Sequence, residues 1–307
     1  MNNEVVSIDL GSNSFRVLKY DCINQKVISD YHEVVGTADG LVETGIISKA
    51  AEQRVIKALL LSIKKVNYDP SKAIAVTTAA MRKATNNQEI LKSFENQTGV
   101  KFKIIDGIEE ARLTLIAVKY ALKRENINSS KFILLDIGGG STEIIINTDD
   151  RYEAHSFDFG IVTMTQEFFL YDDLQKNLNS RKDQIRKYLD SLNLNLEEYK
   201  FVATAGTPTT IAAIKLGQDF FSYDKDIVNG TIVNLGDLTK CLSIIKNSTK
   251  QELRNLVGRG KVEFIQVGIY IYQAIFEVLG KKESIVLDDG LREGVAINHY
   301  LEKQYNK

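Results

Sequence analysis

Tryptophan is absent from this 307-residue chain, and proline, cysteine and histidine are scarce. The two cysteines, Cys22 and Cys241, cannot build a disulfide framework and stand in no metal-ligand spacing. Their scarcity favours a reducing compartment, so we expect a cytoplasmic protein. The only prolines are Pro70 and Pro208, and no low-complexity stretch occurs. We therefore expect any two domains to be joined by ordered structure and not by a tether.

Neither strong charge nor a long apolar run is present. The net charge is −1, so no global field attracts nucleic acid or an anionic membrane, and we expect neither as a partner. Residues 1–4 show neither a basic nor an apolar region of a secretory signal. The most apolar stretch, 264–279, carries Gln266, Gln273 and Glu277 and is too short to span a bilayer comfortably. It predicts a buried helix.

Two familiar site motifs are also missing. The chain has no Gly-x-x-x-x-Gly-Lys-Ser/Thr sequence, which argues against an NTPase of the Walker type. His32, His155 and His299 are scattered, and no His-Glu-x-x-His occurs. A zinc site of that kind is therefore not expected.

The chain does contain a glycine-rich run, 136–143, that reads Asp-Ile-Gly-Gly-Gly-Ser-Thr-Glu between two apolar runs. The pattern predicts strand, turn and strand. Successive glycines allow positive φ and leave no Cβ in the way of a ligand, and bare N–H groups can bind phosphate. Asp136 and Glu143 border this turn and could hold Mg²⁺ beside a phosphate. The expected phosphate-binding residues are Gly138, Gly139, Gly140, Ser141 and Thr142. The competing interpretation is an ordinary hairpin with a flexible tip.

A second copy of the pattern begins the chain. The run 9–14 reads Asp-Leu-Gly-Ser-Asn-Ser, and Asp9 corresponds to Asp136. Such internal similarity predicts two related lobes, each with a phosphate-sized turn. We expect Ser12, Asn13 and Ser14 to bind phosphate and Asp9 to be a further candidate metal ligand.

Each lobe reads as three strands followed by helix, strand and helix, which predicts an α/β fold. The expected lobes are residues 1–125 and 126–307, with the last helix, 291–305, joining the first lobe. They would face each other across an interdomain cleft, since ligands of α/β folds bind at strand ends. The expected strands are 4–9, 15–20, 26–35, 73–77, 101–105, 132–136, 143–147, 152–157, 201–204 and 284–287.

Two charged positions are candidates for the chemistry. Glu109 and Glu110 open the expected helix 108–123, where a carboxylate could orient a water for attack on phosphorus. Alternatively, both merely offset the helix dipole, and the spacing does not choose between them. Arg82 follows a strand and could clamp phosphate oxygens, or it could be a solvated surface arginine.

Another anion site is expected where a strand enters a helix at Gly206 and Thr207. In this interpretation Thr207 is the N-cap and Pro208 is the first helical residue, where a missing N–H has no cost. A simple tight turn is an equal alternative.

With both loops identified, the sequence resembles the Ppx/GppA phosphatase family of exopolyphosphatases and guanosine pentaphosphate phosphohydrolases. The resemblance implies the actin, sugar-kinase and heat-shock ATPase fold, which is ribonuclease H-like. The sequence departs from the family pattern in three places. The chain ends before the HD-type C-terminal domain of long members. The segment 35–41 lacks the arginine that many members have there, and Asp106 replaces a commoner serine. Further matching segments are 77–86, 106–113, 205–207 and 289–295.

The resemblance also implies roles. The catalytic glutamate of the family is the second of its pair, which is Glu110, and Asp136 and Glu143 would act with Mg²⁺. It implies hydrolysis of terminal phosphate from inorganic polyphosphate, or alternatively from guanosine pentaphosphate. A sugar or acetate kinase and an inactive binding protein are the other classes considered. It assigns no role to 288–294 and leaves a homodimer open.

Overall fold

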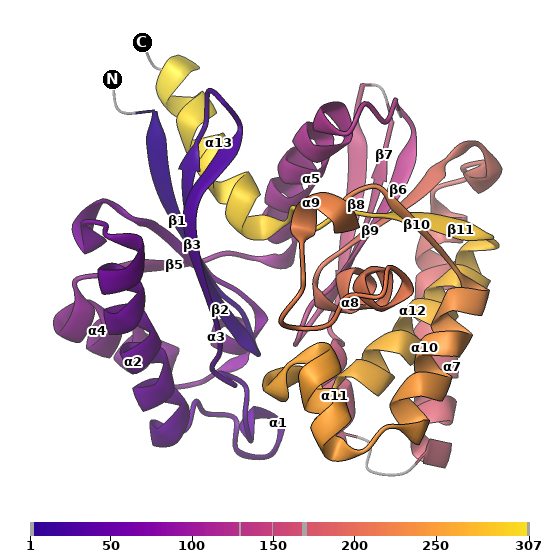
Figure 1. Cartoon of the computed structure of the whole chain (residues 1–307), viewed down its shortest axis with the longest axis horizontal. Helices are drawn as coiled ribbons and strands as arrows, with labels where there is room; N and C mark the ends of the chain where they lie inside the picture. Colours follow the sequence, from indigo (N-terminus) through magenta and orange to yellow (C-terminus); the bar gives the residue numbers. More distant parts are fainter. Residues whose placement is uncertain (1–2, 129, 149, 168–170, 306–307) are drawn as a thin grey trace. The chain divides into compact units, whose positions relative to one another are not determined.

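The computed structural model describes residues 3–128, 130–148, 150–167 and 171–305 (Figure 1). The chain divides into two compact units. Residues 1–119 and 289–307 form the first unit, and residues 120–288 form the second. Each is a mixed α/β unit built on one sheet.

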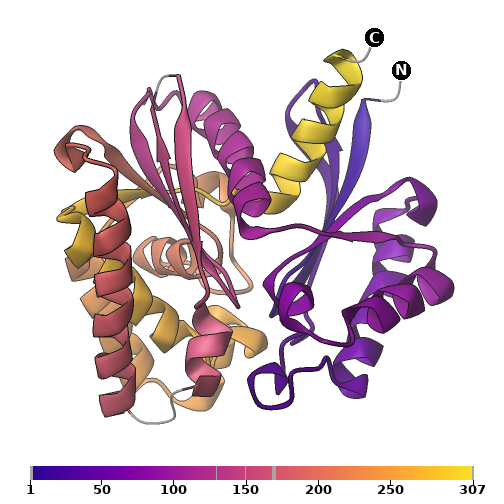
Figure 2. The ribbon, with the colours of Figure 1, turned by 180° about the vertical axis from the view of Figure 1, so that it is seen from behind.

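The sheet of the first unit has the strand order β3-β2-β1-β4-β5. β1 to β3 form an antiparallel meander, whereas β4 and β5 run parallel to β1. Figures 1 and 2 show α13 on one face of this sheet and α2 with α4 on the other. The strands are β1 (Glu4–Leu10), β2 (Ser14–Asp21), β3 (Lys26–Val34), β4 (Ile74–Thr77) and β5 (Phe102–Ile104). The helices are α1 (Leu41–Thr44), α2 (Lys49–Val66), η1 (Pro70–Lys72), α3 (Ala79–Lys83), α4 (Asn87–Thr98), α5 (Gly107–Arg124) and α13 (Leu291–Tyr305).

The sheet of the second unit repeats this order and adds one strand. Read from its other edge, it is β8-β7-β6-β9-β11, with β10 beyond β11 as an antiparallel edge. β6, β9 and β11 are parallel, and β7 and β8 complete an antiparallel meander. The strands are β6 (Phe132–Ile137), β7 (Thr142–Asn147), β8 (Tyr152–Phe157), β9 (Lys200–Thr204), β10 (Thr231–Asn234) and β11 (Glu283–Val286). The helices are α6 (Ile161–Glu167), α7 (Tyr171–Ser191), η2 (Leu196–Glu198), α8 (Gly206–Lys215), α9 (Lys225–Val228), α10 (Leu235–Asn247), α11 (Lys250–Val257), η3 (Arg259–Lys261) and α12 (Ile265–Leu279).

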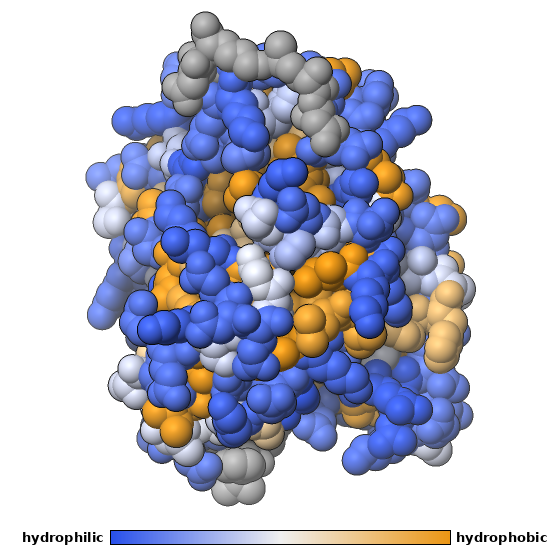
Figure 3. Space-filling model, turned by 90° about the vertical axis from the view of Figure 1, so that its left-hand side faces the viewer, coloured by the Kyte–Doolittle hydropathy of each residue, from blue (hydrophilic) through white to orange (hydrophobic). Residues whose placement is uncertain are grey.

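Hydrophilic residues cover most of the face seen in Figure 3, with smaller apolar areas between them. In the described part of the chain, no helix is both long enough and apolar enough to cross a membrane. The apolar stretch expected to be a buried helix is α12, and its residues Ile269 and Tyr272 are fully buried.

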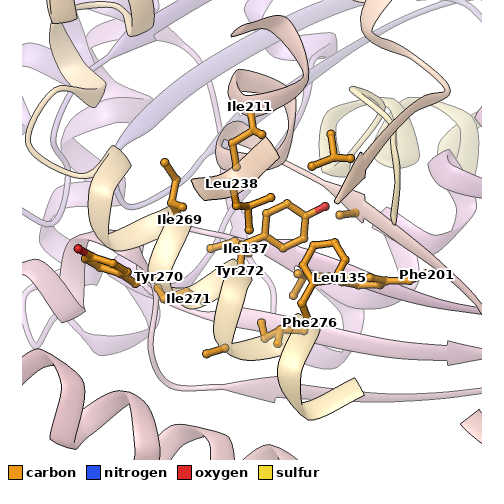
Figure 4. Close-up of a cluster of buried hydrophobic side chains, with 14 of the residues drawn as sticks. Leu135, Ile137, Phe201, Ile211, Leu238, Ile269, Tyr270, Ile271, Tyr272 and Phe276 are labelled. Carbon is orange, nitrogen blue, oxygen red and sulfur yellow. The ribbon is translucent and has the colours of Figure 1, made fainter. Parts of the chain in front are cut away.

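The largest core cluster lies in the second unit (Figure 4). Side chains from α8, α10 and α12 point toward β6 and β9, so that Phe276 stacks edge-on against Phe201 with ring centroids 5.0 Å apart. All six residues of β6 are buried, as expected for a central strand with apolar contacts on both faces. This rigid strand ends at the glycine-rich turn.

Most expected elements form, but several details differ. α3, α9 and β10 are short and were not expected. α8 begins at Gly206, so the prediction that Thr207 is its N-cap and Pro208 its first residue is wrong. Ala205 makes the turn with φ of 73° and is itself the N-cap, without a side-chain hydrogen bond. Thr207 is buried instead, with its hydroxyl facing Gly268 on α12.

Candidate active site

The two glycine turns have the same hydrogen bond. The N–H of Gly138 donates to the carbonyl of Ser141 over 3.0 Å, and the N–H of Gly11 donates to that of Ser14 over 2.9 Å. Each turn follows the first strand of its unit and leads into the second. The described glycines with positive φ lie elsewhere, so that part of the expectation for the 138–140 run is wrong. The glycines instead allow neighbouring backbone segments to approach the turn closely.

Close approach is clearest in the second unit, where the turn packs against the start of α6. The N–H groups of Ile161 and Val162 donate to the carbonyls of Gly138 and Gly139 over 3.0 and 2.8 Å. A Cβ on Gly160 would lie 2.6 Å from backbone atoms of both glycines. The turn's carbonyls are therefore fixed toward α6. Sequence reasoning did not single out Gly160, although a glycine follows the third strand of each unit.

The side chains that follow the second turn are also buried. Ser141 and Thr142 are 2% and 0% exposed. The Thr142 hydroxyl donates to the carbonyl of Phe159 over 2.7 Å. This hydroxyl therefore helps hold the turn, and a phosphate here would meet backbone groups.

In the first unit, the segment after β3 makes hydrogen bonds to the turn like those that the start of α6 makes in the second unit. The carbonyl of Asn13 accepts from the N–H groups of Val35 and Gly36, each over 2.9 Å, and that of Ser12 accepts from Ala38 over 2.8 Å. Both turn residues are buried. The segment that departs from the commoner family pattern is thus the one that holds this turn.

Asp136 and Glu143 face each other across the second turn. They are directly paired on β6 and β7, and their side chains therefore lie on the same face of the sheet. They are 9% and 1% exposed, and Ser156 donates to Oε1 of Glu143 over 2.6 Å. Two adjacent buried carboxylates repel each other unless a proton or cation lies between them. The pair therefore fits Mg²⁺, which commonly binds one or two carboxylates with water and substrate phosphate.

The residues described supply no group of three or more potential metal ligands of the histidine, cysteine or carboxylate type. An ion held by Asp136 and Glu143 would thus take its other oxygens from water or substrate. Asp9 occupies the equivalent place on β1, but the residue paired with it on β2 is Arg16. A neighbouring guanidinium already supplies positive charge there. Asp9 is therefore a weaker candidate metal ligand than the Asp136–Glu143 pair.

Glu110 lies in the first turn of α5 and is bound by Arg82. The Nη1 of Arg82 donates to Oε2 of Glu110 over 2.9 Å and to the carbonyl of Ile105 over 2.8 Å. The Glu110 side chain is 10% exposed and that of Arg82 is 21% exposed. Arg82 is thus no solvated surface arginine, and its nearest anionic group is a carboxylate of the protein.

The neighbouring Glu109 has a different partner. Its two carboxylate oxygens accept from Nε and Nη2 of Arg112 over 2.7 and 2.9 Å. The Nη1 of Arg112 reaches Asn298 of α13, so this pair ties two helices together. The hydrogen bond from Arg112 lowers the pKa of Glu109 below its ordinary value. Glu109 therefore has a structural partner, which separates it from Glu110 as the sequence spacing could not.

A lysine that the sequence analysis did not identify, Lys261, lies beside the start of α8. The Nζ of Lys261 lies 3.0 Å from the Thr210 hydroxyl and 3.5 Å from the Gly206 carbonyl. A cation beside a helix N-terminus opposes the helix dipole, an arrangement that an anion would relieve. Lys261 lies 55 residues from Gly206 in sequence, so no local pattern indicated it.

Comparison with known proteins decides the family. The sequence model described as the Ppx/GppA phosphatase family matches residues 21–303. The chain belongs to the Ppx/GppA phosphatase family. As a member, it is a hydrolase of the phosphatase kind, and the resemblance drawn from the two loops is confirmed.

Two curated relatives of this chain are named for different activities. A Haemophilus influenzae protein named "Putative exopolyphosphatase" is 27% identical over 309 residues, which cover 98% of this chain and 92% of that one. A Vibrio vulnificus guanosine-5'-triphosphate,3'-diphosphate pyrophosphatase is 30% identical over 302 residues. That match covers 94% of this chain and 58% of the Vibrio protein, so the chain spans less than two thirds of that relative's length.

A solved family member has the same fold. The crystal structure of the Aquifex aeolicus Ppx/GppA protein is 26% identical, covers 98% of each chain and superposes with a TM-score of 0.74. Together with the repeated strand order, this confirms two mixed α/β lobes of the actin-like ATPase fold.

Proposed function

We propose that this Ppx/GppA member is a magnesium-dependent exopolyphosphatase that releases terminal orthophosphate from inorganic polyphosphate. The observation that carries the proposal is the buried Asp136–Glu143 pair beside a turn whose carbonyls are fixed toward α6. This arrangement suits a metal-bound phosphate. The Haemophilus protein, which the chain matches almost end to end, supports the choice of substrate.

In the proposed reaction, a water oxygen attacks the terminal phosphorus, and the bond to the bridging oxygen breaks. The products are orthophosphate and a chain one phosphate shorter. Glu110 orients and deprotonates the water, and Arg82 positions Glu110 through Nη1. The remaining N–H groups of Arg82 are proposed to bind phosphate oxygens.

The two loops and the helix start at Gly206 and Thr207 are proposed to bind phosphates, largely through backbone N–H groups. Asp136 and Glu143 would hold Mg²⁺, with Asp9 as a weaker candidate. When bound, the ion supplies neutralisation of charge on the transferred phosphoryl group.

A second candidate substrate is guanosine pentaphosphate, in which the 5′ γ-phosphate would be removed by the same chemistry. The name of the Vibrio relative favours it. Both substrates present a terminal phosphoanhydride, so the groups described here suit either.

The deciding experiment measures orthophosphate release from polyphosphate and guanosine pentaphosphate side by side, with Mg²⁺ and with EDTA. We expect faster release from polyphosphate, and only with Mg²⁺. Faster release from guanosine pentaphosphate would establish the alternative. Release from neither, or phosphate transferred to a sugar, would overturn both.

A cysteine nucleophile is not part of the proposal. Burial raises the pKa of Cys22 to about 12 and that of Cys241 to about 11, which keeps both thiols protonated at neutral pH. A cytoplasmic location and a homodimer are proposed as well. Cell fractionation and sedimentation of the purified chain would test them.

A further inference from the structure

A cavity of about 450 Å³ lies in the second unit, at the starts of β9 and β11 and beside β10. Its apolar lining comes from Ile127, Phe201, Ile232 and Ile285. The volume falls in the range of sites that enclose a small molecule.

The cavity lies away from the glycine turn. Lys200, on its rim, pairs with Phe132 at the start of β6, whereas Asp136 pairs with Thr204 at the far end of the same strands. Four strand residues correspond to about 13 Å. A ligand in this cavity would therefore not occupy the place proposed for the reacting phosphate.

The rim of the cavity is basic. Lys200, Lys281 and Lys282 line it, and Glu283 is its single carboxylate. Lys200 donates to the carbonyl of Asn128 over 2.9 Å, which fixes its ammonium. Lys281 donates to the carbonyls of Leu196 and Glu197 over 2.5 and 3.3 Å, and burial lowers its pKa.

The third lysine of the rim is available to a ligand. Lys282 is exposed, and no hydrogen bond or ion pair joins it to another residue in the part of the chain that the structure describes. The apolar lining and cationic rim suit a molecule with an apolar body and an anionic group.

We propose that this cavity binds a nucleoside phosphate, with the base on the apolar lining and the phosphate at the lysine rim. Inorganic phosphate alone would leave the apolar surface uncovered, and a neutral base would leave the Lys282 ammonium without an anion. The site is independent of the proposed polyphosphatase activity, because none of its residues belongs to the loops or carboxylates assigned to that reaction.

The test measures binding of adenosine 5′-monophosphate and guanosine 5′-monophosphate to the full chain by amide NMR, with ribose 5-phosphate and the free nucleosides as partial ligands. We expect saturable shifts at residues 230–232 and 281–285 for at least one nucleotide, and at least tenfold weaker binding of both partial ligands. Lys282→Glu reverses a rim charge and Ile232→Asp places a carboxylate in the lining. Each should weaken binding by about tenfold or more.

Lys240→Glu is the matched control, since Lys240 is an exposed lysine of α10 outside the cavity, and it should leave binding unchanged. Both lining variants change exposed side chains, so folding should persist, and the amide spectrum itself reports it. No saturable binding of either nucleotide up to roughly 1 mM would overturn the proposal. Binding that Glu143→Gln weakens and Lys282→Glu does not would also overturn it, because the nucleotide would then occupy the glycine turn.

Discussion

Arg82 Nη1 donates to Glu110 Oε2 over 2.9 Å, joining residues 28 positions apart in the chain. The bond connects α3 to the first turn of α5. A charge-assisted hydrogen bond of this kind fixes the direction of a carboxylate more firmly than a neutral one does. If Glu110 orients the attacking water, Arg82 acts through it.

This relationship predicts that the two residues behave as one unit. Glu110→Gln should lower the rate of phosphate release by about 10²- to 10⁴-fold, because a general base is lost. Arg82→Gln should lower it by about tenfold or more. The double variant should lose less than the product of the two single losses, since Arg82 acts partly through Glu110 and residues that act together are not additive.

Steady-state phosphate release by the four proteins measures this coupling. Arg112→Gln is the control, because it removes a guanidinium from the neighbouring Glu109 and should keep most of the activity. Fully multiplicative losses in the double variant would show that Arg82 does not act through Glu110.

The carboxylate pair predicts how the enzyme responds to magnesium. Asp136→Asn and Glu143→Gln should each raise the Mg²⁺ concentration for half-maximal activity by about tenfold, because each removes a charged oxygen ligand. Asp9→Asn should have a smaller effect, since Arg16 is its cross-strand partner. Magnesium titrations of the three variants decide this. An equal shift for Asp9→Asn would show that both units contribute ligands.

The sequence predicted the repeated part of the molecule well, for a physical reason. In β1 and β6 an Asp is followed by one aliphatic residue and then by the glycine of the turn, and both strands form as expected. Ser48, a common type of N-cap residue, accepts from the N–H of Ala51 at the start of α2. Such features depend on residues a few positions apart.

What the sequence did not predict depends on distant contacts. The role of Gly160 appears only when α6 packs on the turn, and Lys261 meets Gly206 only in the folded unit. The start of α8 was misplaced because a common N-cap residue, Thr207, is used as a packing residue against α12. The spacing alone did not choose between Glu109 and Glu110, whereas the family resemblance selected Glu110 and the structure gives the two different arginine partners.

Packing at Gly160 predicts a sensitive position. Gly160→Ala would place a Cβ 2.6 Å from the backbone of the turn, so the turn must move. We expect activity to fall at least tenfold and the free energy of unfolding to fall by about 1–3 kcal/mol. Gly11→Ala is the contrast, because its Cβ would be an ordinary 3.5 Å from the Ser14 carbonyl. It should fold with near parental stability in urea unfolding, and equal losses in the two variants would contradict the packing argument.

The pair of Glu109 and Arg112 predicts a pH dependence of stability. The pKa of Glu109 is lowered by the hydrogen bond from Arg112, from an ordinary value of 4.5. A carboxyl group whose pKa is lower in the folded state stabilises the protein above its unfolded pKa and loses that contribution as pH falls through the folded one. Below pH 4.5, the parent should therefore lose stability faster than Arg112→Gln. Urea unfolding between about pH 3 and 7 measures this, with Glu109→Gln expected to behave like Arg112→Gln. Parallel curves for all three would refute it.

The segment 288–294, to which the family resemblance gave no chemical role, has a structural one. Glu293 accepts from the N–H of Gly290 over 3.0 Å and from Nε of Arg292 over 2.7 Å, which stabilises the start of α13. Gly294 lets this helix approach α5 closely, since a Cβ there would lie 1.9 Å from the carbonyl of Leu113.

Gly294→Ala should therefore destabilise the first unit by about 3 kcal/mol or more, because helix and backbone must separate. The measurement is urea unfolding followed by circular dichroism. Lys303→Ala, an exposed change on the same helix, should have an effect within about 0.5 kcal/mol. If Gly294→Ala kept parental stability but lost activity, the segment would take part in the reaction itself, and the packing role assigned here would be wrong.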